Sequence, residues 1–237
     1  MSVEVLKNRK ENGDAREELR SRGLDMTSSR ITRVLRKLGL IKGLTIGDRL
    51  KSWDVLMTVN FINANVPRNS PVLDIGAYSS EVPCILHRDH YTDISAIDLN
   101  PGIMSMPYSG EIRYSMANFM ETPFDDSSFA AVTATSVIEH GFRSRALLAE
   151  LSRILRPGGF FIASVDYWPD KIDTSGKDAF GMDWMIFSRE DLAGFIREAG
   201  EFGFSPFGEM NFDAGEPVIN WQGESYTFAW FVIQKTA

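Results

Sequence analysis

The sequence predicts an α/β domain in which helices cover both faces of a mostly parallel sheet. Five short apolar runs recur between residues 71 and 165, and segments with the apolar spacing of amphipathic helices lie between most of them. The composition also predicts a folded globular chain, because 43% of the 237 residues are hydrophobic and 24% are charged. This length is sufficient for one large α/β domain with an N-terminal extension.

The N-terminal part is the least regular. Residues 1–25 are mostly polar, with Gly13 and Gly23 interrupting helical spacing, so an ordered arm and a mobile tail are both compatible with them. Helices are expected from Ser28 to Gly39 and from Asp48 onward. Their predicted apolar stripes are Ile31, Val34, Leu35 and Leu38, and Leu50, Trp53, Met57 and Phe61.

The remaining elements alternate along the chain. Strands are expected at 71–75, 94–99, 112–116, 129–135 and 160–165. Helices are expected at 79–88, 143–156 and 188–199, the last one capped by Ser188. Two β-like runs, 204–212 and 226–234, then predict an antiparallel hairpin that completes the sheet.

Charge and cysteine content exclude several classes of protein. The net charge is −7, from 25 basic and 32 acidic residues, which argues against a nucleic-acid partner and suits a neutral or sugar-like small molecule. The single Cys84 excludes an internal disulfide and a cysteine metal site. Because the sequence has neither a membrane-length apolar run nor an apolar signal-peptide core at its N-terminus, we expect a cytoplasmic protein.

The ends of the first two predicted strands carry the candidate ligand site, because doubly wound sheets bind ligands beyond the carboxyl ends of their strands. The first strand ends in VLDIGAYSS, where Gly76 permits a sharp turn after Asp74 and the following helix start offers free N–H groups. The second ends in AIDLNP, which places the Asp98 carboxylate where it can accept both hydroxyls of a ribose.

The motifs VLDIG, AIDLNP, ETPFDDSSFAAV, SVIEH and LRPGG resemble, in order and spacing, those of the class I S-adenosylmethionine (SAM)-dependent methyltransferases over roughly residues 70–200. The resemblance implies SAM as cofactor and a Rossmann-like, seven-stranded sheet of order 3-2-1-4-5-7-6 with strand 7 antiparallel. We predict an N-terminal helical arm or lid over 1–65 and a SAM-binding domain over 66–237. The expected cofactor contacts are Asp74, Gly76, Ala77, Tyr78, Asp98, Leu99, Asn118, Phe119 and Ser136.

The chain departs from this pattern at the glycine-rich loop. The family usually reads D/E-x-G-x-G-x-G there, whereas Tyr78 and Ser80 replace the second and third glycines. Tyr78 either packs over the methionine part of the cofactor or steers the loop away from it, and a lost cofactor site is the alternative. Asp74 is equally compatible with holding the loop, and Asn118 with forming a turn.

The residues after the fourth and fifth strands are candidates for catalysis. Methylation of a hydroxyl requires removal of its proton, and His140 is the candidate general base, with Glu139 and Asp166 beside it as further candidates. The alternative is that Glu139 and His140 only shape the cofactor loop. Some family members read E-x-x-E-H here and bind magnesium. Since Ser136 replaces their first ligand, a magnesium site would use Glu139, His140 and Asp166.

Two segments, about 167–187 and 212–226, are rich in glycine, aspartate and aromatic residues and are expected to form an acceptor lid. Their Tyr167, Trp168, Trp184 and Trp221 either hold a sugar ring or pack the loops onto the core. We therefore predict O-methylation of a saccharide or polyol hydroxyl, for example a mannoside of a bacterial polysaccharide. The acceptor would be a small molecule or an oligosaccharide, and a homodimer is compatible with the sequence.

Three alternatives remain at this stage. They are C- or N-methylation of another small molecule, an NAD-binding oxidoreductase and a non-catalytic SAM-binding subunit. The oxidoreductase is disfavoured because the first turn lacks G-x-G-x-x-G.

Overall fold

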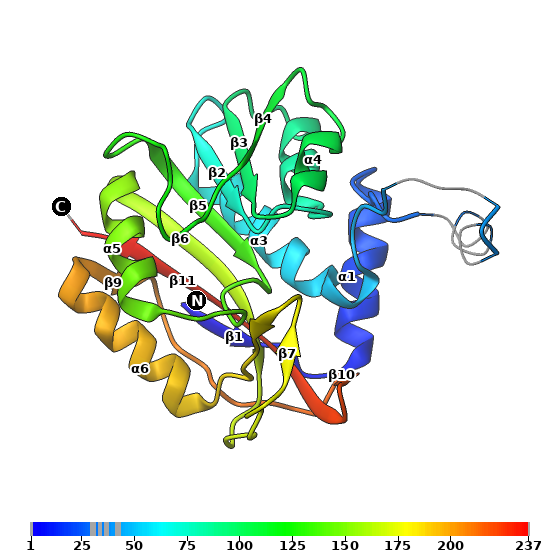
Figure 1. Cartoon of the computed structure of the whole chain (residues 1–237), viewed down its shortest axis with the longest axis vertical. Helices are drawn as coiled ribbons and strands as arrows, with labels where there is room; N and C mark the ends of the chain where they lie inside the picture. Colours follow the sequence, from blue (N-terminus) through cyan, green and yellow to red (C-terminus); the bar gives the residue numbers. More distant parts are fainter. Residues whose placement is uncertain (1, 29–31, 33–34, 36–37, 41–43, 237) are drawn as a thin grey trace.

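A computed structural model describes residues 2–28, 32, 35, 38–40 and 44–236. Within these residues, a nine-stranded sheet has the order β1-β11-β6-β5-β2-β3-β4, with β9 and β10 also paired to β11 (Figure 1). The strands are β1 (Val3–Val5), β2 (Val72–Ile75), β3 (Ile94–Asp98), β4 (Ile112–Met116), β5 (Phe129–Thr135), β6 (Leu155–Tyr167), β9 (Phe204–Pro206), β10 (Ile219–Trp221) and β11 (Glu224–Lys235). A separate short hairpin consists of β7 (Asp178–Ala179) and β8 (Met182–Asp183).

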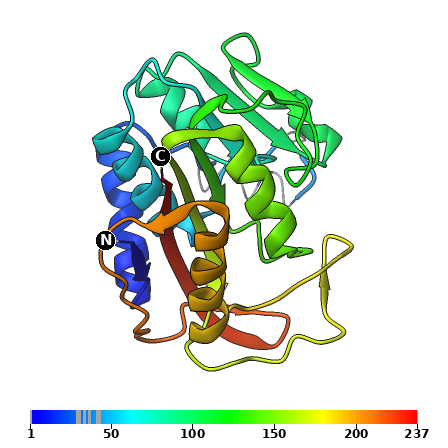
Figure 2. The same ribbon diagram turned by 90° about the vertical axis from the view of Figure 1, so that its left-hand side faces the viewer.

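Helices cover both faces of the sheet, as predicted. They are α1 (Arg9–Ser21), α3 (Ser52–Asn65), α4 (Val82–Arg88), α5 (Ser144–Ile154) and α6 (Arg189–Ala199), with 3-10 turns η1 (Arg49–Lys51), η2 (Pro101–Ser105) and η3 (Gly200–Phe202). Figure 2 shows α1 and α3 on one side of the sheet and α5 and α6 on the other. Because both faces are covered, the central strands are mostly buried, β2 at every position.

The predicted strand order is confirmed. Strands β2 to β6 pair in parallel, and β11 runs antiparallel to β6. The strands β4, β3, β2, β5, β6, β11 and β9 correspond to the expected order 3-2-1-4-5-7-6. The last hairpin differs from its prediction. The run at 204–212 forms a strand only over β9, and the turn at Gln222 and Gly223 joins β10 to β11.

The N-terminal segment adds a strand that the sequence does not predict. Strand β1 pairs antiparallel with β11, Val3 opposite Phe231 and Val5 opposite Ala229. Next to it, β9 pairs with the following residues of β11, Pro206 opposite Ile233. The two short strands thus share one edge of β11. A three-residue strand has too few alternations to show a pattern in the sequence.

The helices predicted from Asp48 onward hold for their positions and fail in part for their faces. The helix predicted from Ser28 to Gly39 lies mostly outside the described residues, and its Leu38, which is described, is 65% exposed. Helix α6 begins after Ser188, which forms a capping box with Asp191. Leu50 was expected in the core but is 48% exposed, because it belongs to η1 and not to α3. Of the first predicted stripe, Ile31 and Val34 lie outside the described residues. No helix in the described ranges is long and apolar enough to cross a membrane.

Candidate functional site

A cavity of about 1020 Å³ lies at the carboxyl ends of β2, β3 and β5. Its walls are the loop 76–81 after β2, the segment 98–101 after β3, residues 135–140 after β5 and parts of 27–55 from the N-terminal segment. The β7–β8 hairpin closes one side through Phe180 and Met182. Since pockets for drug-sized ligands measure roughly 300–1000 Å³, this cavity has room for a large cofactor together with a small acceptor.

Most of the predicted cofactor residues lie together in this cavity. Those that line it are Gly76, Tyr78, Asp98, Leu99, Phe119 and Ser136. The Asp98 carboxylate accepts the backbone N–H of Tyr78 at 2.9 Å and that of Asn100 at 2.7 Å. These two bonds fix the carboxylate between the loops that follow β2 and β3.

Gly76 is required by the geometry of the loop after β2. Its φ is +66°, and a Cβ atom there would lie 2.4 Å from Cγ2 of Val137. A side chain at this position would therefore be strained and would also collide with the residues that follow β5. Tyr78, which replaces a glycine of the family pattern, lines the cavity. Its ring packs closely on Gly102, because a Cβ atom on Gly102 would lie 2.5 Å from Cε2 of Tyr78.

Asp74, Ala77 and Asn118 do not line this cavity. Asp74 is buried and accepts a hydrogen bond from the Thr133 hydroxyl, and burial raises its pKa to about 7. Asn118 accepts the backbone N–H of Met120 at 2.9 Å, which is the turn-forming alternative. In this structure these residues shape the loops around the cavity and do not face into it.

His140 lines the cavity, whereas its neighbour Glu139 is fully buried. The His140 ring lies edge-on to Phe180, with 5.3 Å between the ring centroids. Burial lowers the pKa of His140 to about 4, although the charge of Asp166 opposes this shift. The Glu139 carboxylate accepts a hydrogen bond of 2.6 Å from the Ser136 hydroxyl, and burial raises the pKa of Glu139. The imidazole is therefore neutral at pH 7.

Behind the cavity, Asp54 and Asp166 join Glu139 in a group of buried carboxyls. Asp166 accepts the indole N–H of Trp184 at 2.8 Å, and Asp54 accepts the Ser164 hydroxyl at 2.7 Å. Burial is the largest cause that raises the pKa of each aspartate to about 7, and the ammonium of Lys51 partly offsets it. Asp54 and Lys51 are not among the residues predicted from the sequence. The signal that points to Asp54 is a lone aspartate in the apolar segment SWDVLMTVNF.

The described residues do not support the predicted magnesium site at Glu139, His140 and Asp166. Among the described residues, no three histidine, cysteine, aspartate or glutamate side chains are grouped so that they could hold a metal ion. One oxygen of Glu139 is bonded to Ser136 and one of Asp166 to Trp184, so these two carboxylates are engaged with separate partners.

The predicted acceptor aromatics pack onto the core and do not line this cavity. Tyr167 is fully buried and donates to the Phe212 carbonyl at 2.8 Å; it lies on the opposite face of β6 from Asp166 because side chains alternate along a strand. Trp184 packs edge-on against Trp221, with 4.7 Å between the ring centroids, and Trp168 packs against the core. Phe180, which the sequence analysis did not single out, lines the cavity and is 84% exposed.

Comparison with known proteins adds a consistent set of similarities. A family model described as "Methyltransferase domain" matches residues 73–163. Among curated proteins, the O-methyltransferase resE of Aspergillus sclerotiorum is 27% identical over 95 residues, covering 37% of this chain and 36% of that protein. The O-methyltransferase cnsE of Penicillium expansum is 28% identical over 96 residues, covering 39% and 34%. The chain thus matches about a third of the length of these relatives.

Solved structures share the fold. A SAM-dependent methyltransferase from Methanosarcina mazei superposes with a TM-score of 0.56 at 14% identity, covering 74% of this chain and 97% of that one. The 1,6-didemethyltoxoflavin-N1-methyltransferase of Burkholderia thailandensis, solved with its substrate and S-adenosylhomocysteine, gives 0.56 at 18% identity, covering 78% and 79%.

Proposed function

We propose that the chain is a class I SAM-dependent methyltransferase, that it transfers the methyl group of SAM to a hydroxyl of a small acceptor, and that this acceptor is a saccharide or polyol; the match of residues 73–163 to a methyltransferase domain supports this proposal. The observation that carries the proposal is the position of His140, the only one of the three histidines that lines the cavity. Two of the curated proteins that it resembles are O-methyltransferases.

The residues around the cavity fit the cofactor. Asp98 would accept the ribose hydroxyls, Phe119 would lie against the adenine, and Gly76 lets the backbone approach without a side chain in the way. When bound, SAM supplies an electrophilic methyl group on a positively charged sulfur. The neighbouring loop residues Tyr78 and Ser136 would complete the pocket.

The chain's own contribution to chemistry is to orient the acceptor and take its proton. His140 would accept the hydroxyl proton while the acceptor oxygen is oriented toward the methyl group that SAM supplies when it is bound. This step requires a neutral imidazole, which the lowered pKa of about 4 supplies at physiological pH.

Support for a sugar-like acceptor comes from residues other than those predicted. Phe180 and Tyr78 present exposed aromatic side chains at the cavity, and Asp48 and Lys51 line the same space. An aromatic face combined with charged hydrogen-bonding groups suits a ring that has both apolar C–H faces and hydroxyls. We also expect the protein to be cytoplasmic. A homodimer is a further hypothesis, which a light-scattering measurement of the molar mass in solution tests.

The test is methyl-donor turnover on a panel of free sugars, glycosides and polyols, with phenols, amines and carbon nucleophiles alongside. Turnover confined to sugars or polyols is the expected result. Turnover only on amines or carbon acceptors would replace O-methylation by the N- or C-methyl alternative. Calorimetric binding of S-adenosylhomocysteine without turnover would indicate a non-catalytic subunit, and binding of NAD instead would indicate the oxidoreductase.

Chelation should not affect the reaction. Because the described residues offer no three-ligand cation site, we expect turnover to be unchanged in excess EDTA and unchanged again when magnesium is added. Loss of activity in EDTA and its recovery with magnesium would show that the acceptor or residues outside the described ranges bring in the ion.

A further inference from the structure

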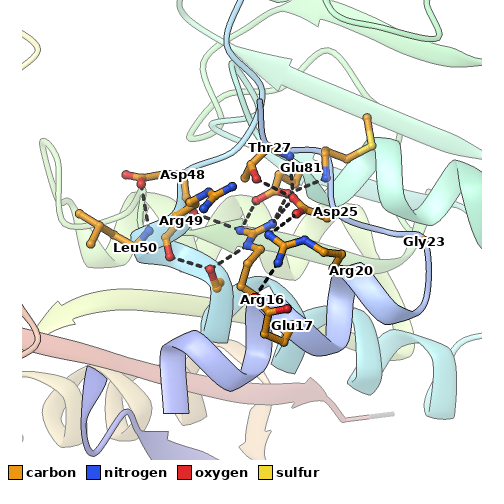
Figure 3. Close-up of polar contacts among 12 residues, drawn as sticks. Arg16, Glu17, Arg20, Gly23, Asp25, Thr27, Asp48, Arg49, Leu50 and Glu81 are labelled. Atoms are coloured by element: carbon orange, nitrogen blue, oxygen red, sulfur yellow. Dashed lines mark hydrogen bonds and ion pairs between the residues drawn. The ribbon is translucent and has the colours of Figure 1, made fainter. Parts of the chain in front are cut away.

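Arg16 of α1 lies at the centre of a polar network beside the cavity (Figure 3). Its guanidinium donates two parallel hydrogen bonds to Glu81, each 2.7 Å long. Both side chains are almost completely removed from solvent, with 4% of Arg16 and 1% of Glu81 exposed. Such a bidentate arginine–carboxylate pair fixes orientation as well as distance.

The same guanidinium reaches three other parts of the chain. Nε donates to the Ser52 hydroxyl at 2.9 Å, where α3 begins, and Nη2 donates to the Asp48 carbonyl at 3.3 Å. Nη1 also donates to Asp25 at 3.2 Å. One buried side chain thus connects α1, the turn at residue 25, the cavity wall around residue 48 and the start of α3.

Glu81 is the last residue of the loop 76–81, which is expected to hold the cofactor. Its carboxylate also accepts the backbone N–H of Met26 at 3.2 Å. Gly47 packs directly on it: the φ of Gly47 is +74°, and a Cβ atom there would lie 2.3 Å from Cδ of Glu81. Gly47 also donates its N–H at 2.8 Å to the carbonyl of Ser79, a loop residue with a left-handed φ of 66°. Met26 and Gly47 therefore hold this loop at Ser79 and Glu81.

We propose that Arg16 is a positioning residue for the cofactor: by binding Glu81, Ser52 and the Asp48 carbonyl together, it holds the loop 76–81 and the wall 48–51 as one rigid surface. The described residues 25–26 and 47–52 are then a fixed wall of the cofactor site and not part of a detachable lid. This inference rests on the proposed function, since it takes the cavity to be the SAM site.

The energetics of buried ion pairs separate this role from a purely structural one. Removing one partner leaves a buried charge unpaired and strongly destabilises a fold, whereas replacing both partners by apolar residues of similar size is often neutral. A fold that only needed this space filled would tolerate the double replacement without loss of cofactor affinity. A positioning pair would not.

The experiment measures the affinity for S-adenosylhomocysteine by calorimetry and the KM for SAM in the wild type, in Arg16→Met/Glu81→Met and in Arg16→Lys. If the wild type does not bind S-adenosylhomocysteine, the result contradicts the proposed function and not the positioning role of Arg16. If it binds, the double variant should unfold near the wild-type temperature yet show a dissociation constant raised roughly tenfold. Its KM for SAM should rise by a similar factor, with a smaller change in kcat.

Arg16→Lys keeps the charge without the bidentate geometry, so its affinity should fall between those of the wild type and the double variant. If the double variant does not fold, the affinity of Arg16→Lys alone tests the proposal. Wild-type affinity in either folded variant would overturn the proposal. The matched control is Arg145→Met, which removes an exposed arginine paired with Glu198 and Glu201 and should leave affinity unchanged.

Discussion

Asp98→Ala is expected to weaken SAM binding by about 2–4 kcal/mol, a rise in dissociation constant of roughly 30- to 1000-fold. The proposed ribose contact is a charged acceptor at the end of β3, and its loss leaves two ribose hydroxyls without a partner. The same carboxylate also accepts the N–H groups of Tyr78 and Asn100, so both adjoining loops lose a fixed point. Calorimetric titration with SAM or S-adenosylhomocysteine measures the change.

A control for Asp98 lies just before the same strand. Asp93 precedes β3 at its amino end, where it pairs with Arg113 and does not line the cavity. Asp93→Ala should therefore leave affinity for SAM unchanged. Asp98→Asn keeps one carbonyl acceptor and should give an intermediate loss. Wild-type affinity in a folded Asp98→Ala protein would show that the cofactor lies elsewhere.

His140→Ala should lower kcat by about 100-fold while the affinity for S-adenosylhomocysteine changes little. General-base removal costs roughly 10²–10⁴ in rate, and the lower end applies because a base with a depressed pKa is a weaker proton acceptor. His87→Ala is the control, since His87 belongs to α4, stacks on Tyr108 and does not line the cavity. Loss of cofactor binding in His140→Ala would instead assign this residue to the SAM pocket.

The pH profile distinguishes the two candidate bases. A base must be unprotonated, and His140 with a pKa of about 4 is already neutral at pH 5. If it acts alone, the rate should be flat from pH 5 to 8 and fall only toward pH 4, without the limb near 6.5 of an unperturbed imidazole. Burial raises the pKa of Asp166 to about 7, so its ionisation would make the rate rise through neutral pH. Because burial also raises the pKa of Asp54 and of Asp74 to about 7, a limb near pH 7 identifies Asp166 as the group that must ionise only if it persists in His140→Ala and disappears in Asp166→Asn.

The sheet and the cofactor edge could be predicted from the sequence because local signals determine them. The strands β2, β3 and β5 are mostly apolar runs; Gly76 directly follows β2, and Asp98 is the last residue of β3. The parallel pairing then brings these residues to one edge of the sheet. Their common cavity follows from position alone, without knowledge of side-chain contacts.

The acceptor side could not be predicted in the same way, because it depends on which face of a loop or strand is covered. Asp54 of α3 meets Ser164 of β6 far along the chain, and nothing local to either residue predicts that contact. Tryptophans in a glycine-rich segment are compatible with a ligand platform or with packing, and Trp184 packs against Asp166 and Trp221. Phe180 owes its position to a short hairpin with no repeating pattern.

The pairing of β1 with β11 has a consequence for the order of folding during synthesis. Residues 3–5 are synthesised before the other strands of this sheet, yet their partners are residues 229–231. Contacts this distant in sequence form late, after the chain between them has been ordered. We therefore expect this edge of β11 to close late, and until then the backbone of β1 is an unpaired strand edge open to association with other chains.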